Sequence, residues 1–152
     1  MEKNQTIIVG IGTSAGGLEA LQHFFNNAPP SDNLAYVIVQ HLSPNYKSLM
    51  VELMSKNTKM RVQEATNNVE VKPNNVYLIP SKNNLTIKDG KLKLKLKGER
   101  DLLNLPIDIF FRSLAADQKK NAIGIILSGT GSDGTLGLRA IKEQGGLLVA
   151  QD

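Results

Sequence analysis

The sequence predicts an α/β fold: a doubly wound, mostly parallel sheet with helices on both faces and an antiparallel β-hairpin insertion. Two observations carry this prediction. Short apolar runs alternate along the chain with segments of helical periodicity, which is typical of a parallel sheet covered by helices. One stretch departs from this alternation, because two segments of alternating polarity flank Asp89-Gly90, a strong two-residue turn signal.

The spacing of the apolar residues predicts the individual elements. Strands are expected at residues 7–11, 35–39, 60–65, 76–79, 123–127 and 147–150, and the hairpin at residues 85–87 and 92–96. Helices are expected at residues 18–25, 46–55 and 135–143, with one more beginning at Pro106. Proline suits the first turn of a helix, and the apolar residues after it recur at helical spacing.

Composition limits the classes of protein to consider. A chain of 152 residues with 41% hydrophobic residues can bury one core, so residues 1–152 are expected to form a single domain. The absence of cysteine excludes disulfides, thiolate chemistry and cysteine zinc sites. No run approaches the roughly 20 apolar residues of a membrane span, and the polar start from Met1 to Thr6 is unlike a secretory signal. We expect a cytoplasmic protein without membrane insertion.

The net charge of +4 raises the question of nucleic-acid binding. Much of the excess comes from lysines that alternate with leucines over residues 88–97, a pattern typical of the solvated face of a strand. Only 5% of the residues are aromatic, which leaves little to stack on bases. Nucleic acid is therefore not expected as a partner, whereas attraction to an acidic protein stays open.

The first candidate motif is GTSAG at residues 12–16, which fits G-x-S-x-G between an expected strand and an expected helix. A sharp turn there lifts the hydroxyl of Ser14 above the sheet, and the following amide can stabilise an oxyanion. Gly10, Gly12 and Ala15 also fit the glycine pattern of a dinucleotide site. That site needs an acidic residue where the second strand ends, and none is present, so the hydrolase is favoured and the nucleotide site stays open.

Two further candidates lie after expected strands. His41 follows the second strand, at the end where open α/β sheets place their ligands, so it is a candidate base. The other histidine, His23, falls inside the first expected helix and is given no catalytic role. Asp133 lies in GTGSDG at residues 129–134, whose glycines would expose backbone amides beside an orienting carboxylate. The alternative for Asp133 is a helix N-cap.

Together, Ser14, His41 and Asp133 would place a nucleophile, a base and an orienting acid at the carboxyl ends of three strands of one sheet. That is the arrangement which a catalytic triad requires. Their order along the chain differs from the Ser, Asp, His order of α/β-hydrolases, so that fold is disfavoured.

These segments resemble the signatures of CheB-type protein-glutamate methylesterases, namely GTSAGG at residues 12–17, Gln40-His41 and GTGSDG at residues 129–134. The resemblance runs over essentially the whole chain with similar spacing. It implies a cytoplasmic enzyme of two-component signalling that demethylates methylated glutamates on chemoreceptors and can deamidate glutamines there. It implies no metal and no cofactor.

The resemblance also implies the role of each site residue. Ser14 would be the nucleophile, His41 the general base and acid, and Asp133 the group that orients His41. The backbone amides of Ala15 and Thr130 would form the oxyanion hole. A regulatory or docking domain that keeps these residues without turnover is the first alternative, and a nucleotide-binding domain is the least favoured one.

The chain also departs from the family pattern. A receiver domain usually precedes the catalytic domain, whereas Met1 lies almost at the first expected strand, so no receiver domain is expected. The position after the serine is often Thr and is Ala15 here. Residues 104–108 read NLPID, which resembles the methylesterase domain that opens CheB/CheR fusion proteins. The expected partners are then a methylated chemoreceptor or another signalling protein, and a covalently fused methyltransferase domain.

The last expected strand, at residues 147–150, is followed by no helix that could cover it. The domain is therefore expected to be truncated at its carboxyl end. Apolar surface is expected to be exposed around Leu147, Leu148 and Val149.

Overall fold

The computed structural model describes residues 6–14, 17–40, 50–98, 105–127 and 132–151. Within these residues the main sheet has six strands in the order β3-β4-β2-β1-β7-β8, and all neighbours are parallel. The strands are β1 (Ile7–Thr13), β2 (Leu34–Gln40), β3 (Arg61–Glu64), β4 (Asn75–Leu78), β7 (Ile123–Ile126) and β8 (Leu147–Ala150). A separate antiparallel pair forms the expected hairpin, consisting of β5 (Asn83–Lys88) and β6 (Lys91–Leu96).

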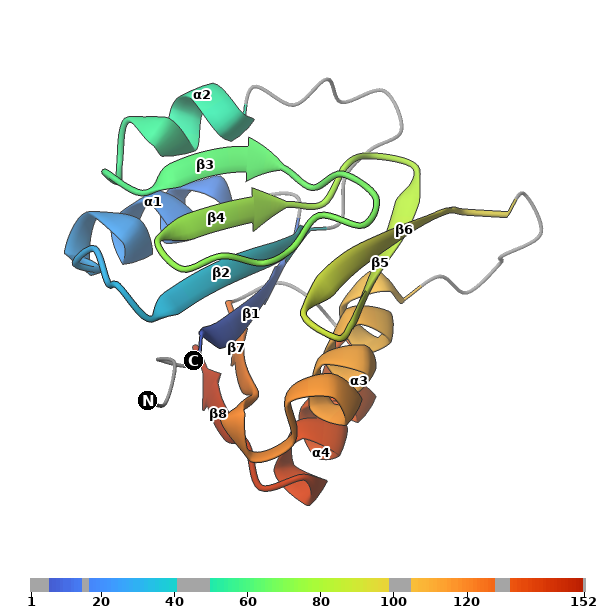
Figure 1. The fold of residues 1–152 in the computed structure, drawn as a ribbon. Coiled ribbons are helices and arrows are strands. Elements are labelled where there is room, and N and C mark those ends of the chain that lie inside the picture. Colours follow the sequence, from blue (N-terminus) through green and yellow to red (C-terminus); the bar gives the residue numbers. More distant parts are fainter. Residues whose placement is uncertain (1–5, 15–16, 41–49, 99–104, 128–131, 152) are drawn as a thin grey trace, which may run out of the picture.

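The helices cover both faces of the sheet (Figure 1). Helices α1 (Leu18–Asn27) and α2 (Met50–Ser55) lie on one face, and α3 (Pro106–Gln118) and α4 (Thr135–Glu143) lie on the other. A short 3-10 helix, Lys119–Asn121, follows α3 and was not expected. The predicted fold class is confirmed, including the hairpin as an insertion between parallel strands.

The predicted boundaries agree with the structure to within a few residues. Of the helix expected at residues 46–55, residues 50–55 are helical, and residues 46–49 lie outside the described part of the chain. No helix in the part of the chain that the structure describes is long and apolar enough to cross a membrane.

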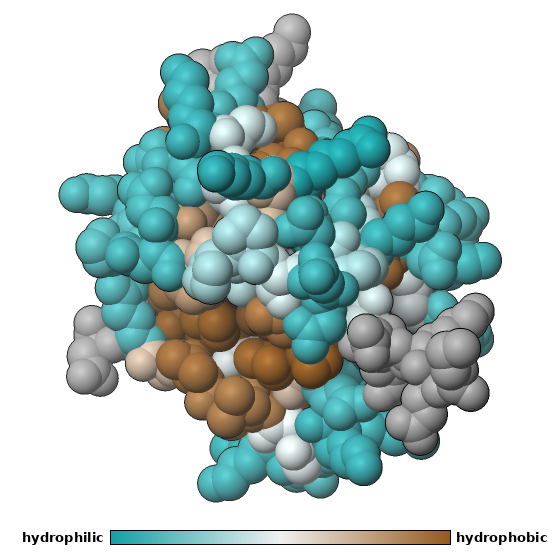
Figure 2. Space-filling view, turned by 60° about the vertical axis from the view of Figure 1, so that its left-hand side comes forward, coloured by the Kyte–Doolittle hydropathy of each residue, from teal (hydrophilic) through white to brown (hydrophobic). Residues whose placement is uncertain are grey.

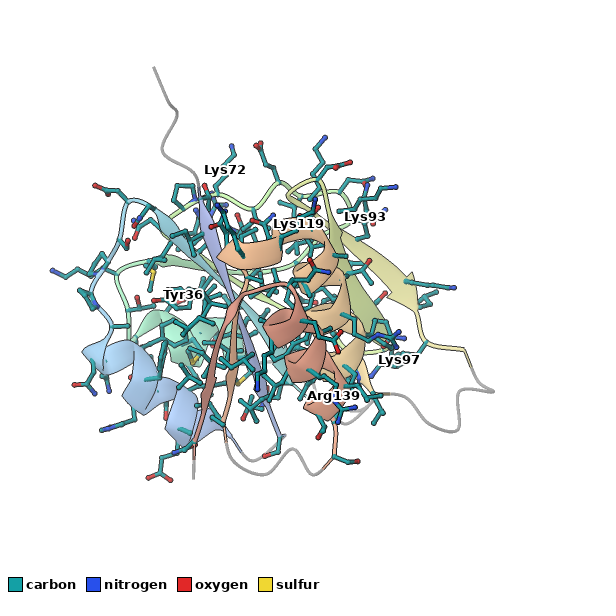
Figure 3. All side chains as sticks on the ribbon, turned by 90° about the horizontal axis from the view of Figure 1, so that it is seen from below. Tyr36, Lys72, Lys93, Lys97, Lys119 and Arg139 are labelled. Atoms are coloured by element: carbon teal, nitrogen blue, oxygen red, sulfur yellow. The ribbon has the colours of Figure 1, made fainter. Side chains whose placement is uncertain are left out.

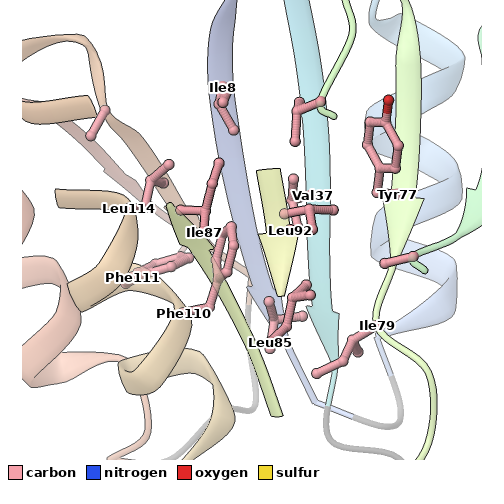
Figure 4. Close-up of a cluster of buried hydrophobic side chains, with 14 of the residues drawn as sticks. Ile8, Val37, Tyr77, Ile79, Leu85, Ile87, Leu92, Phe110, Phe111 and Leu114 are labelled. Atoms are coloured by element: carbon pink, nitrogen blue, oxygen red, sulfur yellow. The ribbon is translucent and has the colours of Figure 1, made fainter. Parts of the chain in front are cut away.

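Alternate residues of the central strands face two hydrophobic cores, as the two-residue period of a strand requires. In β1, Ile8 packs into the core beneath α3 and α4, whereas Val9 packs into the core beneath α1 and α2. The first core also receives the hairpin, because the leucine face of β5 and β6 turns inward (Figure 4). Its labelled members are Ile8, Val37, Tyr77, Ile79, Leu85, Ile87, Leu92, Phe110, Phe111 and Leu114.

The turn of the hairpin is fastened to α3. Asp89 and Gly90 have φ angles of 53° and 74°, which is the left-handed geometry of a two-residue hairpin turn. Their backbone amides donate to the two carboxylate oxygens of Asp117, at 2.6 and 3.1 Å. A carboxylate on the last turns of α3 therefore fixes the hairpin over the sheet.

Strand β8 ends the sheet and exposes apolar side chains, as expected from the sequence. Leu147 is 58% exposed and Val149 is 48% exposed, while Leu148 is half-buried. Figure 2, which turns the left-hand side of Figure 1 toward the viewer, shows hydrophobic side chains gathered in its lower part. Exposed apolar strand edges favour association with other chains.

We expect the double variant Leu147→Lys/Val149→Lys to reduce self-association, because charges on an edge strand disfavour pairing. Sedimentation velocity over a range of concentrations measures the effect, and the average mass should stop rising with concentration. Leu96→Lys is the control, since Leu96 is 73% exposed on the hairpin, away from β8. An equal effect of the control, or a wild-type chain that is monomeric throughout, would contradict this prediction.

Candidate active site

Ser14 lies directly after β1, at the carboxyl end of the strand, and α1 begins four residues later at Leu18. The carbonyl oxygen of Ser14 accepts a hydrogen bond from the amide of Gly17 at 3.0 Å. The same oxygen accepts a second bond, at 3.0 Å, from the side-chain amide of Gln40, which ends the neighbouring strand β2. The backbone of the serine is thus fixed by its own turn and by the adjacent strand.

The sharpness of this turn explains why position 17 is a glycine. A Cβ atom on Gly17 would lie 1.8 Å from the hydroxyl oxygen of Thr13, far inside contact distance. Thr13 is fully buried, so its side chain has little room to move away. The G-x-S-x-G pattern ends at Gly16, which lies outside the described residues, so the requirement for a glycine at position 17 is a finding of the structure.

Gly17→Ala is expected to lower the free energy of unfolding by about 1–3 kcal/mol, the usual cost of overpacking a filled site. Adding Thr13→Ala should recover much of that loss, because it removes the hydroxyl that clashes with the new Cβ. Chemical denaturation of the two single variants and the double variant measures the coupling. Strictly additive losses would show that the clash does not determine the geometry of the turn.

Asp133 lies between β7 and α4 and is only 3% exposed. One carboxylate oxygen accepts from the amide of Ile107 at 3.0 Å, and the other accepts from the amide of Asp108 at 2.9 Å. These are the second and third residues of α3, whose amides have no partner inside the helix. Asp133 therefore caps α3, whereas the N-cap residue of α4, Gly134, makes no side-chain capping bond.

Two glycines bring the start of α3 to this position. A Cβ atom on Gly12 would lie 2.6 Å from Ile107, and one on Gly134 would lie 3.2 Å from the same side chain. Ile107 is fully buried and fills the space that these missing side chains leave. The first turn of α3 can therefore lie against the ends of β1 and β7.

The packing of the glycines also bears on the nucleotide alternative. Cβ atoms on Gly10 would lie within 3.1 Å of side chains of α3, and the space beside Gly12 is filled by Ile107. These glycines allow a helix to approach β1 closely. In a dinucleotide site the equivalent space serves the pyrophosphate, so the structure does not favour that alternative.

Lys97, just past β6 and labelled in Figure 3, interacts electrostatically with Asp133, which the sequence pattern did not indicate. It is half-buried, and burial lowers the pKa of its ammonium, an effect that the negative charge of Asp133 opposes. The alternation expected over residues 88–97 places the leucines inside and the lysines in solvent. Leu92 follows this pattern because it is fully buried, but Leu96 does not, because it is 73% exposed. Lys97 is thus not part of a uniformly solvated face but a cation within electrostatic reach of Asp133.

The structure brings together the strands that carry the predicted site. β1, which leads to Ser14, pairs with β2 on one side and with β7, which leads to Asp133, on the other. His41, Ala15 and Thr130 lie outside the described residues, so their predicted roles are not tested. His23 is exposed on α1, as expected for a residue without a catalytic role.

An open parallel sheet with a serine turn and a buried carboxylate at the carboxyl ends of adjacent strands has the architecture of an α/β enzyme domain. Comparison with known proteins identifies the family. The family profile described as CheB methylesterase matches residues 9–152. The chain belongs to the CheB methylesterase family.

Relatives and a solved structure agree with this assignment. A relative in Leptospira interrogans is 35% identical over 143 residues, which cover 93% of this chain and 74% of the relative. A protein-glutamate methylesterase/protein-glutamine glutaminase of Photorhabdus laumondii is 31% identical, and the match covers 95% of this chain and 42% of that protein. The crystal structure of the Thermotoga maritima CheB methylesterase catalytic domain superposes with a TM-score of 0.82 at 30% identity, covering 97% of this chain and 80% of that one. Enzymes with these names are carboxylic-ester hydrolases.

Proposed function

We propose that this chain is a serine-dependent protein-glutamate methylesterase in which Ser14 is the nucleophile, His41 the base and Asp133 the residue that orients the base. The backbone amides of Ala15 and Thr130 form the oxyanion hole. The reaction needs no metal and no cofactor. Family membership and the fold support the reaction class, and the geometry around Asp133 supports the assignment of roles.

The observation that carries this proposal is the buried carboxylate of Asp133, held by two amides after the strand next to that of Ser14. A carboxylate offers about four acceptor positions, and the two amides of α3 use two of them. A second hydrogen bond per oxygen is therefore compatible with the geometry. A carboxylate fixed in this way can hold an imidazole in one tautomer and stabilise its charged form.

The proposed chemistry proceeds through an acyl-enzyme. His41 takes the proton of the Ser14 hydroxyl as its oxygen attacks the carbonyl carbon of the glutamate γ-methyl ester. The methoxy group then leaves with that proton as methanol. His41 then takes a proton from a water molecule as that water attacks the acyl-enzyme. The glutamate side chain is released, and His41 passes the proton from the water to the oxygen of Ser14. The same route deamidates glutamine, with ammonia as the leaving group.

The proposed substrate is a methylated glutamate on a chemoreceptor or on another signalling protein of the cytoplasm. The relatives bear methylesterase and glutaminase names, which supports a glutamyl side chain as the group acted upon. A methyltransferase domain fused to this one stays part of the proposal, on the strength of the sequence at residues 104–108.

A fluorophosphonate probe is expected to label Ser14, because its position in the turn and the proposed oxyanion amides activate it above other serines. Peptide mapping of the adduct by mass spectrometry identifies the residue. Ser14→Ala should abolish labelling, whereas the control Ser113→Ala, which changes a serine of α3 that is bonded to β5, should not. An adduct on Ser43 or Ser128 would contradict the role of the turn.

Asp133→Asn is expected to lower turnover on the order of 10⁴-fold, by analogy with the same substitution in another serine triad. It should also cost about 1 kcal/mol of stability, because asparagine offers one acceptor oxygen where two amides of α3 point. Steady-state kinetics on a methyl-ester peptide, measured well below the melting temperature, separate the two effects.

The matched control is Asp117→Asn, which also removes one of two acceptors for backbone amides, but at the opposite end of α3. It is expected to lose similar stability and to keep its turnover. Turnover near the wild-type level in Asp133→Asn would leave Asp133 as a helix cap alone.

A further inference from the structure

Helices α3 and α4 lie side by side (Figure 1). The start of α3 is capped by a carboxylate just before α4, and the start of α4 is bonded by a carboxylate of α3. Asp133, at the start of α4, accepts from the amides of Ile107 and Asp108 in the first turn of α3. In return, the side chain of Asp108 accepts from the amide of Gly137, the third residue of α4, at 2.8 Å. We call these three hydrogen bonds the reciprocal clasp.

The clasp is needed because neither helix has a local cap. The N-cap positions are Leu105 in α3 and Gly134 in α4, and neither makes a side-chain capping bond. Leucine and glycine have no side-chain acceptor to offer. The free amides at both helix starts therefore depend on carboxylates that lie 25 and 29 residues away along the chain.

The close approach of the two helices requires Gly137. A Cβ atom there would lie 2.5 Å from the Cβ of Phe111 and 3.3 Å from a carboxylate oxygen of Asp108. Only a glycine lets the first turn of α4 reach Asp108 at hydrogen-bonding distance. The contact between α4 and Asp108 is consequently built into the packing of the two helices.

To make this contact, the carboxylate of Asp108 is buried, which costs free energy of desolvation. It is 4% exposed, and its second carboxylate oxygen is buried without a hydrogen-bond partner among the described residues. Buried polar atoms without partners are rare in native proteins and call for an explanation beyond stability.

We propose that Asp108 is a positioning residue of the esterase: by holding the first turn of α4, it fixes the orientation of Asp133 toward the catalytic base. This inference rests on the proposed function, in which Asp133 orients His41. Asp133 precedes α4 by two residues, so a shift of the helix start moves its carboxylate directly. Asp108 acts through Asp133 and does not itself contact the substrate.

The first test does not depend on catalysis. Amide hydrogen exchange at Ile107, followed by NMR, reports whether Asp133 stays bound to α3. In Asp108→Ala the Ile107 amide is expected to exchange about fivefold faster or more, because Asp133 is no longer held in place. The control Asp117→Ala, which removes two carboxylate–amide bonds to the hairpin turn at the other end of α3, should leave that rate unchanged. Unchanged exchange in Asp108→Ala overturns the proposal, whether or not the protein turns over esters.

The second test is a double-mutant cycle in turnover. Asp108→Ala is expected to lower kcat about 10- to 100-fold with KM within about twofold, since displacement of a catalytic group affects the chemical step. Asp108→Asn keeps an oxygen for the Gly137 amide and should restore most of the kcat. In an Asp133→Asn background, Asp108→Ala should cause little further loss of kcat, because the Asp133 carboxylate that Asp108 positions is already removed.

The outcomes separate this inference from the proposed function. Two results overturn the positioning role. In the first, the fold-losses in kcat caused by Asp108→Ala and by Asp133→Asn multiply in full in the double variant. In the second, Asp108→Asn does not restore the kcat that Asp108→Ala loses. A wild-type chain without turnover overturns the proposed function. In that case, the exchange rate of the Ile107 amide still tests whether Asp108 holds Asp133 in place. Should Asp108→Ala not fold, Asp108→Ser, whose shorter side chain also lacks the carboxylate, is measured in its place with the same expected results.

Discussion

The close approach of α3 to the ends of β1 and β7 is the constraint on which the site depends. Ile107 occupies the space that side chains at Gly12 and Gly134 would need, so the helix can begin directly beside the sheet. Its first amides then meet Asp133 in a buried setting, where a hydrogen bond to a charged acceptor is strong. Larger residues at either glycine would move the helix start away, and the carboxylate would lose the donors that fix it.

Helix α3 is therefore held at both of its ends by carboxylate–amide bonds. At its start Asp133 completes the first turn, where a negative charge is also favoured by the helix dipole. Near its end Asp117 binds the amides of the hairpin turn. The hairpin and the site are thus connected through one rigid element, and Lys97, just past the second hairpin strand, comes within reach of the charge on Asp133.

The fold was predictable because each layer leaves a periodic signal in the sequence. Strands β1 and β2 alternate between two cores, and the Asp89-Gly90 turn has the positive φ angles that its residue types favour. The placement of Asp133 after a strand was also predictable. The helix that it caps was not, because the partners are distant in the sequence and the amides of α3 have no residue-type signature. For the same reason, the half-buried Lys97 and the role of Asp108 leave no local pattern.

The parallel order of the sheet has a consequence for how the protein folds. The hairpin and its fastening to α3 join segments that are close in the sequence and can form early. By contrast, Val9 lies opposite Ile123 in the sheet, so β1 and β7 meet only after a long loop of chain has closed. Ser14 and Asp133 follow these two strands. We therefore expect the pairing that brings them together to form late in folding, and a chain that has only its local structure has no site.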